Sequence, residues 1–193
     1  MPLAAQSLGD VRFVVTVSAS LTTIAEDNLF ERAARLRSEV FSAAAVDAAR
    51  HMHELDLEVS RSGARFDEFS AAWDANRSAR WFRRVYGDDR PAPPDHPYRT
   101  WYRSVMDDDP VPGWRALKTP ALLFFGDPAL DRSSPVAASV AAAEALRREG
   151  RDLEVVSFRG ADHSLQQNRK DAPIAEPLMR WLDRVVGGRT KRP

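Results

Sequence analysis

The chain of 193 residues contains no cysteine. This excludes disulfide bonds and metal sites built from thiolates, and it leaves the redox compartment undetermined. The sequence also lacks an excess of charge of either sign, because 28 basic residues balance 28 acidic ones. A neutral chain gives no electrostatic reason to expect nucleic acid or an anionic membrane as a partner.

Long apolar runs, targeting segments and phosphate-binding loops are missing as well. No apolar stretch approaches the roughly 18 residues that a membrane span needs. The first residues lack the charged region and apolar core of a signal peptide, so we expect a cytoplasmic protein. There is no glycine-rich loop of the Gly-x-Gly-x-x-Gly or Walker type, and we expect no cofactor.

What the chain does contain is typical of one globular domain, with 44% hydrophobic and 29% charged residues. The β-branched, apolar run Val11–Ser18 predicts a strand buried on both faces. Further along, the pattern predicts strand, helix, strand and helix over Ala121–Phe125, Val136–Arg148, Leu153–Phe158 and Ile174–Val186. This alternation indicates an α/β fold with about three parallel strands joined by crossover helices.

Residues 21–114, between the first and second predicted strands, are helical in pattern. Apolar residues recur at spacings of three and four from about Thr23 to Val59, and again from about Phe66 to Tyr86. We expect a single domain over residues 1–193 that carries residues 21–114 as an inserted helical cap. The tryptophans of this segment either line a pocket for an acyl or aromatic group or pack in its core; they are Trp73, Trp81 and Trp101.

Two loops that directly follow predicted strands carry ionisable groups. The first contains Gly126 and then Asp131-x-x-x-Pro135, and the second contains Gly160-Ala-Asp-His163. An acid and a histidine at the ends of successive strands are two members of a Ser-His-Asp triad. Taken singly, the histidine suits an ordinary surface loop and the aspartate suits a turn.

The two motifs, in this order and spacing, resemble the acid and histidine loops of the α/β-hydrolase superfamily. They are most similar to its prolyl-oligopeptidase-like and dienelactone-hydrolase-like branch. Residues 3–186 then correspond to the C-terminal half of a family member, with Leu3–Ala5 at a helix end. The resemblance implies a partial α/β-hydrolase fold and hydrolysis of ester or peptide bonds through an acyl-enzyme. It makes His163 the general base and then acid, and Asp131 its orienting partner.

The acid loop departs from the family pattern, which has aspartate three positions after the glycine. That position is Ala129 here, and aspartates stand at Asp127 and Asp131 instead. Asp131 keeps the expected distance to Pro135 and is our preferred acid, with Asp127 as the alternative.

The nucleophile is the member that the sequence does not supply. Ser7 lies in a near-elbow pattern, but a strand follows it, whereas an elbow needs a strand before it and a helix after it. Ser18 and Ser20 lie between a strand and a helix, yet neither has the flanking glycines. We expect the nucleophile and the oxyanion donors to lie outside this chain, which alone would be inactive.

Other candidate sites are weaker. His51 and His53 are two residues apart and would not share a helical face, so we expect no metal site there. The acidic run Asp107–Asp109 suits a solvated helix end.

The alternative to a hydrolase is a non-catalytic module that binds a ligand or another protein. The hydrolase reading implies a small ester or peptide substrate. In either case the Val11–Ser18 strand would leave an apolar edge unpaired. Such an edge favours self-association or pairing with a complementing N-terminal half.

Overall fold

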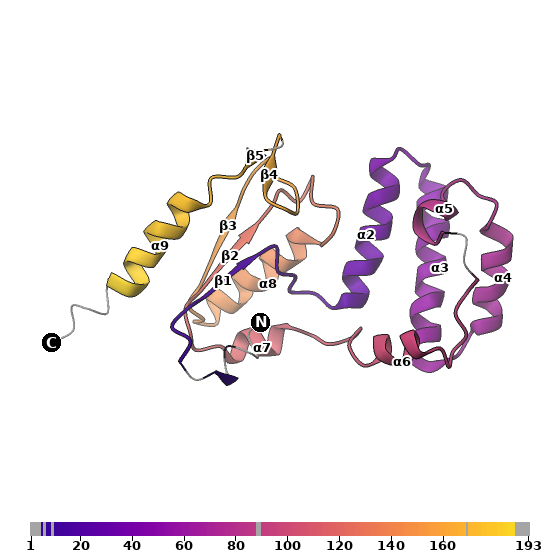
Figure 1. Cartoon of the computed structure of the whole chain (residues 1–193), viewed down its shortest axis with the longest axis horizontal. Coiled ribbons are helices and arrows are strands. Elements are labelled where there is room, and N and C mark those ends of the chain that lie inside the picture. Colours follow the sequence, from indigo (N-terminus) through magenta and orange to yellow (C-terminus); the bar gives the residue numbers. More distant parts are fainter. Residues whose placement is uncertain (1–4, 6, 9, 88–89, 169, 188–193) are drawn as a thin grey trace. The chain divides into compact units, whose positions relative to one another are not determined.

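The computed structural model describes residues 5, 7–8, 10–87, 90–168 and 170–187, and Figure 1 shows their helices and strands. The chain divides into two compact units. Met1–Thr22 and Asp109–Pro193 form the sheet unit, and Thr23–Asp108 form the helical unit. Within the described ranges, no helix is both long and apolar enough to cross a membrane.

The sheet unit is built on three parallel strands in the order β1 (Val14–Val17), β2 (Ala121–Phe125), β3 (Leu153–Ser157). Val14 lies opposite Ala121, which in turn lies opposite Leu153. This confirms the predicted class, a partial α/β-hydrolase-like sheet of three parallel strands. The first strand is shorter than the predicted Val11–Ser18, because Val14 already faces the first residue of β2. Leu3 and Ala4, assigned above to a helix end, lie outside the described residues.

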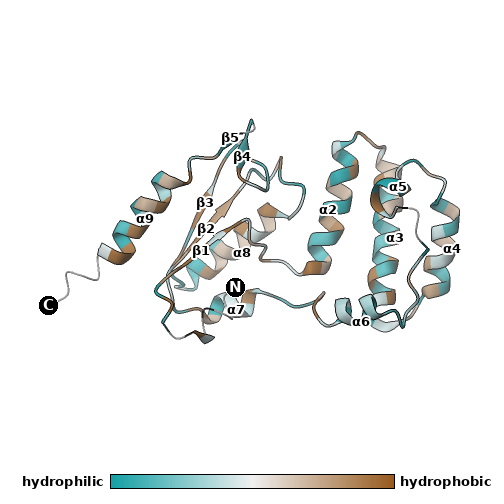
Figure 2. Ribbon diagram, in the orientation of Figure 1, coloured by the Kyte–Doolittle hydropathy of each residue, from teal (hydrophilic) through white to brown (hydrophobic). Residues whose placement is uncertain are grey.

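Strand β2 forms the centre of the sheet unit and is buried along its whole length. Its side chains alternate between the two faces, as the period of two requires. Helix α8 (Val136–Arg148) packs against Ala121, Leu123 and Phe125, whereas α9 (Ala175–Gly187) packs against Leu122 and Phe124. Figure 2 shows β2 in the colours of hydrophobic residues. Helices therefore cover both faces of β2 and fix its position in the sheet unit.

Smaller elements complete the sheet unit. Helix α7 (Val111–Ala116) contributes Trp114 to the cluster on the α8 face. A polar antiparallel pair, β4 (Gln166–Gln167) with β5 (Lys170–Asp171), follows the histidine loop and was not predicted.

The helical unit contains α2 (Ile24–Ser38), α3 (Ala43–Ser62), α4 (Phe66–Asn76), α5 (Phe82–Val85) and α6 (Pro97–Arg103). The predicted helical stretch from Thr23 to Val59 is two helices. Val40 adopts a left-handed φ of 60° between them, and Ser42 caps α3 by accepting the N–H of Ala45. Thr23 starts α2 with a capping box that includes Glu26.

The tryptophans of the helical unit do not form one pocket. Trp73 and Trp81 are buried in a core that also contains Phe69 and Phe82. The Trp73 and Phe82 rings meet edge-on with centroids 4.8 Å apart. Trp101 on α6 is instead 59% exposed. Core packing therefore accounts for Trp73 and Trp81.

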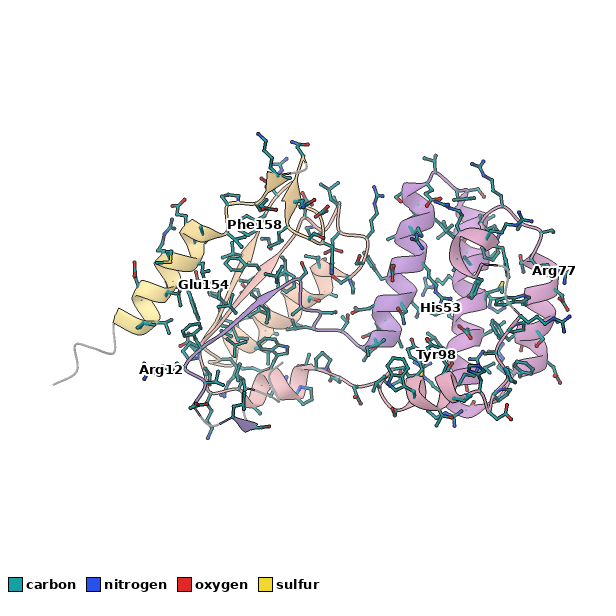
Figure 3. The ribbon with its side chains drawn as sticks, viewed as in Figure 1. Arg12, His53, Arg77, Tyr98, Glu154 and Phe158 are labelled. Atoms are coloured by element: carbon teal, nitrogen blue, oxygen red, sulfur yellow. The ribbon has the colours of Figure 1, made fainter. Side chains whose placement is uncertain are left out.

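A buried histidine without hydrogen bonds lies in the same unit. His53 lies on α3 (Figure 3) and is 2% exposed, and neither of its ring nitrogens has a hydrogen-bond partner. Burial, and secondarily the charge of Arg32, lowers the pKa of His53 to about 3. His51, two residues earlier, is exposed, so the two rings do not share a face.

This burial predicts a loss of stability in acid. In the unfolded chain His53 binds a proton near pH 6.5, whereas the folded chain binds it only near pH 3, so stability falls as pH drops through this window. Between pH 7 and pH 5 the loss attributable to His53 should be about 2 kcal/mol. Urea unfolding of the wild type and His53→Leu at both pH values measures it. His51→Leu, at an exposed position, is the control, and equal pH dependence in wild type and His53→Leu would refute the assignment.

Candidate active site

Two loops leave the same edge of the sheet. Residues 126–135 follow β2, and residues 158–165 follow β3. Because the strands are parallel neighbours, their carboxyl ends lie side by side. Backbone hydrogen bonds join the loops: Phe158 N–H donates to Phe125 O at 2.9 Å, and Asp127 N–H donates to Ala161 O at 2.8 Å. The two loops therefore behave as one layer across the strand ends.

Gly126 allows this close approach. A Cβ atom at this position would lie 2.9 Å from Ala161 O and closer still to Asp162 O. Both neighbours are backbone atoms, which cannot rotate away as a side chain can. Glycine is required here because there is no room for a side chain, and not because of a positive φ angle. Its small size lets the histidine loop lie directly over the end of β2.

The two predicted site residues meet in this layer. His163 Nδ1 lies 3.0 Å from Asp131 Oδ2 and 3.2 Å from Oδ1. The Asp131 side chain is 0% exposed, and that of His163 is 42% exposed. Asp131 Oδ1 also accepts the backbone N–H groups of Ser133 at 2.9 Å and Ser134 at 3.0 Å. The carboxylate is thus fixed by its own loop, and the imidazole reaches from it toward solvent.

This pairing sets the tautomer of the ring. A carboxylate oxygen only accepts hydrogen bonds, so Nδ1 carries a proton, and in the neutral imidazole Nε2 is then the nitrogen with the lone pair. His163 lines a cavity of about 540 Å³ together with Leu130, Arg132 and Gln166. A neutral Nε2 beside an open cavity can take a proton from a hydroxyl group or a water molecule that enters it.

Asp127, the alternative acid, has different partners. Its Oδ2 accepts Gly160 N–H at 2.8 Å and its Oδ1 accepts Ala129 N–H at 2.9 Å. The bond from Gly160, and then that from Ala129, lowers the pKa of Asp127. The structure therefore brings Asp131, and not Asp127, against the imidazole. Asp127 joins the acid loop to the histidine loop.

The contacts of the candidate serines differ from those expected of a nucleophile that faces the His163 ring. Ser18 donates its Oγ hydrogen bond to the main-chain oxygen of His163 at 2.6 Å. Ser20 pairs with Thr22 Oγ1 at 2.7 Å, and Ser7 is exposed before β1. Sequence patterns could not predict the Ser18 contact, because the two residues are 145 positions apart.

Gly126→Ala should open this layer. The added methyl group must displace the backbone at Ala161 and Asp162, which we expect to cost about 1–3 kcal/mol of unfolding free energy. The shift should also lengthen the hydrogen bond between His163 Nδ1 and Asp131, which would change the NMR chemical shifts of the His163 ring. Gly187→Ala, where a Cβ meets nothing within 4 Å, is the control. An unchanged His163 ring in Gly126→Ala would show that the loops are not in tight contact.

Three comparisons with known proteins were made, and one of them identifies a family. The model of the prolyl oligopeptidase family matches residues 69–189, which include both loops. Among solved structures, the chain resembles one described as a candidate non-heme bromoperoxidase from Mycobacterium tuberculosis H37Rv, with 16% identity and a TM-score of 0.43. That alignment covers 95% of this chain and 63% of the other, so this chain spans less than two thirds of its length. The search of curated proteins gave no match.

The family match covers more than half of the chain and confirms the resemblance that the two loop motifs carried. The chain belongs to the prolyl oligopeptidase family of the α/β-hydrolase superfamily.

Proposed function

We propose that this protein is a serine-type hydrolase of ester or peptide bonds, in which His163 is the general base and Asp131 orients it. The observation that carries the proposal is the 3.0 Å contact between Asp131 Oδ2 and His163 Nδ1. A fully buried acid holds a half-exposed base, and the base faces a cavity. Membership of a peptidase family supports the same reaction class.

The chemistry follows from the ring geometry. As a hydroxyl oxygen attacks the substrate carbonyl carbon, His163 Nε2 takes the hydroxyl proton, and Asp131 stabilises the imidazolium that forms. His163 then gives this proton to the departing alcohol or amine as the scissile bond breaks. Water repeats the sequence on the acyl-enzyme, with its proton passing through Nε2 to the released hydroxyl.

The attacking hydroxyl and the oxyanion donors belong, in this proposal, to sequence outside residues 1–193. Ser18 donates its hydroxyl hydrogen bond to His163 O, Ser20 pairs with Thr22 Oγ1, and Ser7 lies in the wrong context for an elbow. We further propose that the helical unit serves as a cap for the substrate. Its place in the chain, between β1 and β2, supports this role.

The nucleophile can be tested by complementation. A polypeptide with a strand, Gly-x-Ser-x-Gly and a helix is supplied ahead of residue 1 or as a separate chain. A serine-directed fluorophosphonate probe should then label the added serine. His163→Gln and Asp131→Asn should each slow labelling by about 10³–10⁴-fold, because the base is lost or takes the wrong tautomer.

Asp127→Asn is the matched control, since it makes the same change in the same loop at a residue whose carboxylate accepts the N–H groups of Ala129 and Gly160. It should slow labelling much less than Asp131→Asn. Absence of labelling in the complemented wild type would contradict the hydrolase proposal and favour the ligand-binding or interaction module. Labelling of the uncomplemented chain would show that a serine within residues 1–193 is the nucleophile.

The outer edge of β1 is a second feature with a functional consequence. Val14 and Ser18 donate their N–H groups to the β2 side, at Pro120 O and Phe124 O. Alternation along a parallel strand turns the N–H groups of Val15 and Val17 away from β2. Val17 is 51% exposed and Phe13 is 36% exposed. We propose that this edge pairs with a second copy of the chain.

Self-association through this edge should be visible in solution. We expect a dimer or larger species in analytical ultracentrifugation at tens of micromolar, and Val17→Lys should shift it toward monomer because a charge on an edge strand opposes pairing. Val40→Lys changes another exposed valine, in the helical unit, and is the control. A single monomer peak for the wild type would exclude pairing between copies and leave a complementing segment as the occupant.

A further inference from the structure

We infer that Ser18 is a positioning residue that fixes the main chain of His163 for its role as base. The inference rests on the proposed function of His163 and extends it to a third strand. Ser18 follows β1 directly, and its Oγ donates to His163 O at 2.6 Å. The bond joins segments that are 145 residues apart, and it is a short, direct bond between partly buried groups.

The backbone of Ser18 adopts an unfavourable conformation that this bond explains. Its φ is 50°, in the left-handed region that residues other than glycine rarely occupy. Such a conformation persists only where the surroundings hold it. Two bonds do so here: Ser18 N–H donates to Phe124 O at 2.8 Å, which ends the β1–β2 ladder, and its Oγ reaches His163. The strained turn thus carries the hydroxyl from the edge of the sheet to the histidine loop.

The histidine is then held at two separate points. Asp131 holds the ring through Nδ1, and Ser18 holds the main-chain carbonyl of the same residue. A ring held only by Asp131 could still tilt with its loop. When Ser18 holds the main chain and Asp131 holds Nδ1, the ring keeps one orientation and Nε2 points in one direction. The other loop contacts act on neighbouring residues: Asp127 binds Gly160 N–H, and Asp162 binds Ser164 N–H at 2.9 Å.

The same hydrogen bond also argues against a direct action of Ser18 on the substrate. Its hydroxyl donates its proton to a carbonyl oxygen, so that proton is directed at the main chain. Ser18 is absent from the residues that line the cavity beside the imidazole. It therefore acts through His163 and not on the substrate.

Ser18→Ala tests the inference in the chain as it stands, without any added nucleophile. The readout is the solvent exchange of the His163 Nδ1 proton in NMR spectra, with its resonance identified by its loss in His163→Gln. We expect exchange about fivefold faster in Ser18→Ala, the change that loss of one ordinary hydrogen bond produces. Ser20→Ala is the matched control, because it removes a hydroxyl two residues further along the same segment, one that pairs with Thr22 Oγ1 at 2.7 Å.

Ser18→Gly separates the hydroxyl from the strained backbone. Glycine accepts the positive φ but lacks the Oγ atom, so it should raise the exchange rate as alanine does while unfolding in urea no more easily than Ser18→Ala. Wild-type exchange in both variants would overturn the inference. So would equal acceleration in Ser20→Ala, since that would show a general loosening of the loop.

The outcome is separable from that of the proposed function. Exchange at Nδ1 reports the position of His163 whether or not the protein hydrolyses anything. Slow exchange in the wild type and fast exchange in Ser18→Ala, together with no serine labelling after complementation, would keep the positioning role and remove the hydrolase.

Discussion

The candidate site depends on one steric constraint, the contact of the β2 end with the backbone of the histidine loop. Gly126 leaves no room for a Cβ, because Ala161 O and Asp162 O occupy that space. Only with this contact does the imidazole of His163 come within 3.0 Å of a carboxylate that belongs to the neighbouring loop. Two backbone hydrogen bonds join the same segments on either side of this contact. They run from Asp127 N–H to Ala161 O and from Phe158 N–H to Phe125 O. The site is therefore a property of the sheet edge and not of two independent loops.

Burial explains why the imidazole is held so firmly. Asp131 has no exposed side-chain surface, and a buried carboxylate is costly unless its oxygens accept hydrogen bonds. Ser133 and Ser134 supply two backbone donors, and His163 supplies the third. Without the imidazole, the buried carboxylate of Asp131 would lose one of its hydrogen bonds and become less stable. The free-energy cost of burying this acid therefore favours the ring orientation in which Nδ1 donates to it. The hydrogen bonds that stabilise the loop thus also orient the ring, as the proposed role of His163 requires.

The parts of the fold that sequence patterns predicted were those with one dominant signal. Ala121–Phe125 and Val136–Arg148 agree residue for residue, because one is an unbroken apolar run and the other an alanine-rich helix bounded by Pro135. The break between α2 and α3 was missed because Val40 adopts its left-handed φ without a glycine or proline to mark it. The β4–β5 pair is two residues in each strand, too short for any period to appear.

The choice between the two aspartates shows a further limit of sequence reasoning. Asp127 and Asp131 both follow β2, and only three-dimensional contacts separate the one that binds Gly160 N–H from the one that binds the imidazole. The spacing to Pro135 favoured Asp131, because that distance reflects the turn into α8. Ser18 carried no such local mark, since its partner is set by the neighbouring strands.

The geometry also limits what this chain can contribute to catalysis. A positioned general base typically supplies about 10²–10⁴ in rate, whereas each oxyanion donor and the covalent step add further factors of similar size. In the proposed hydrolase, His163 and Asp131 would supply the first of these contributions. In the proposed mechanism the attacking hydroxyl comes from another residue, because Ser18 donates its hydroxyl hydrogen bond to the main-chain oxygen of His163. Under the proposed function, a segment outside residues 1–193 would deliver the hydroxyl and the oxyanion donors to Nε2 together.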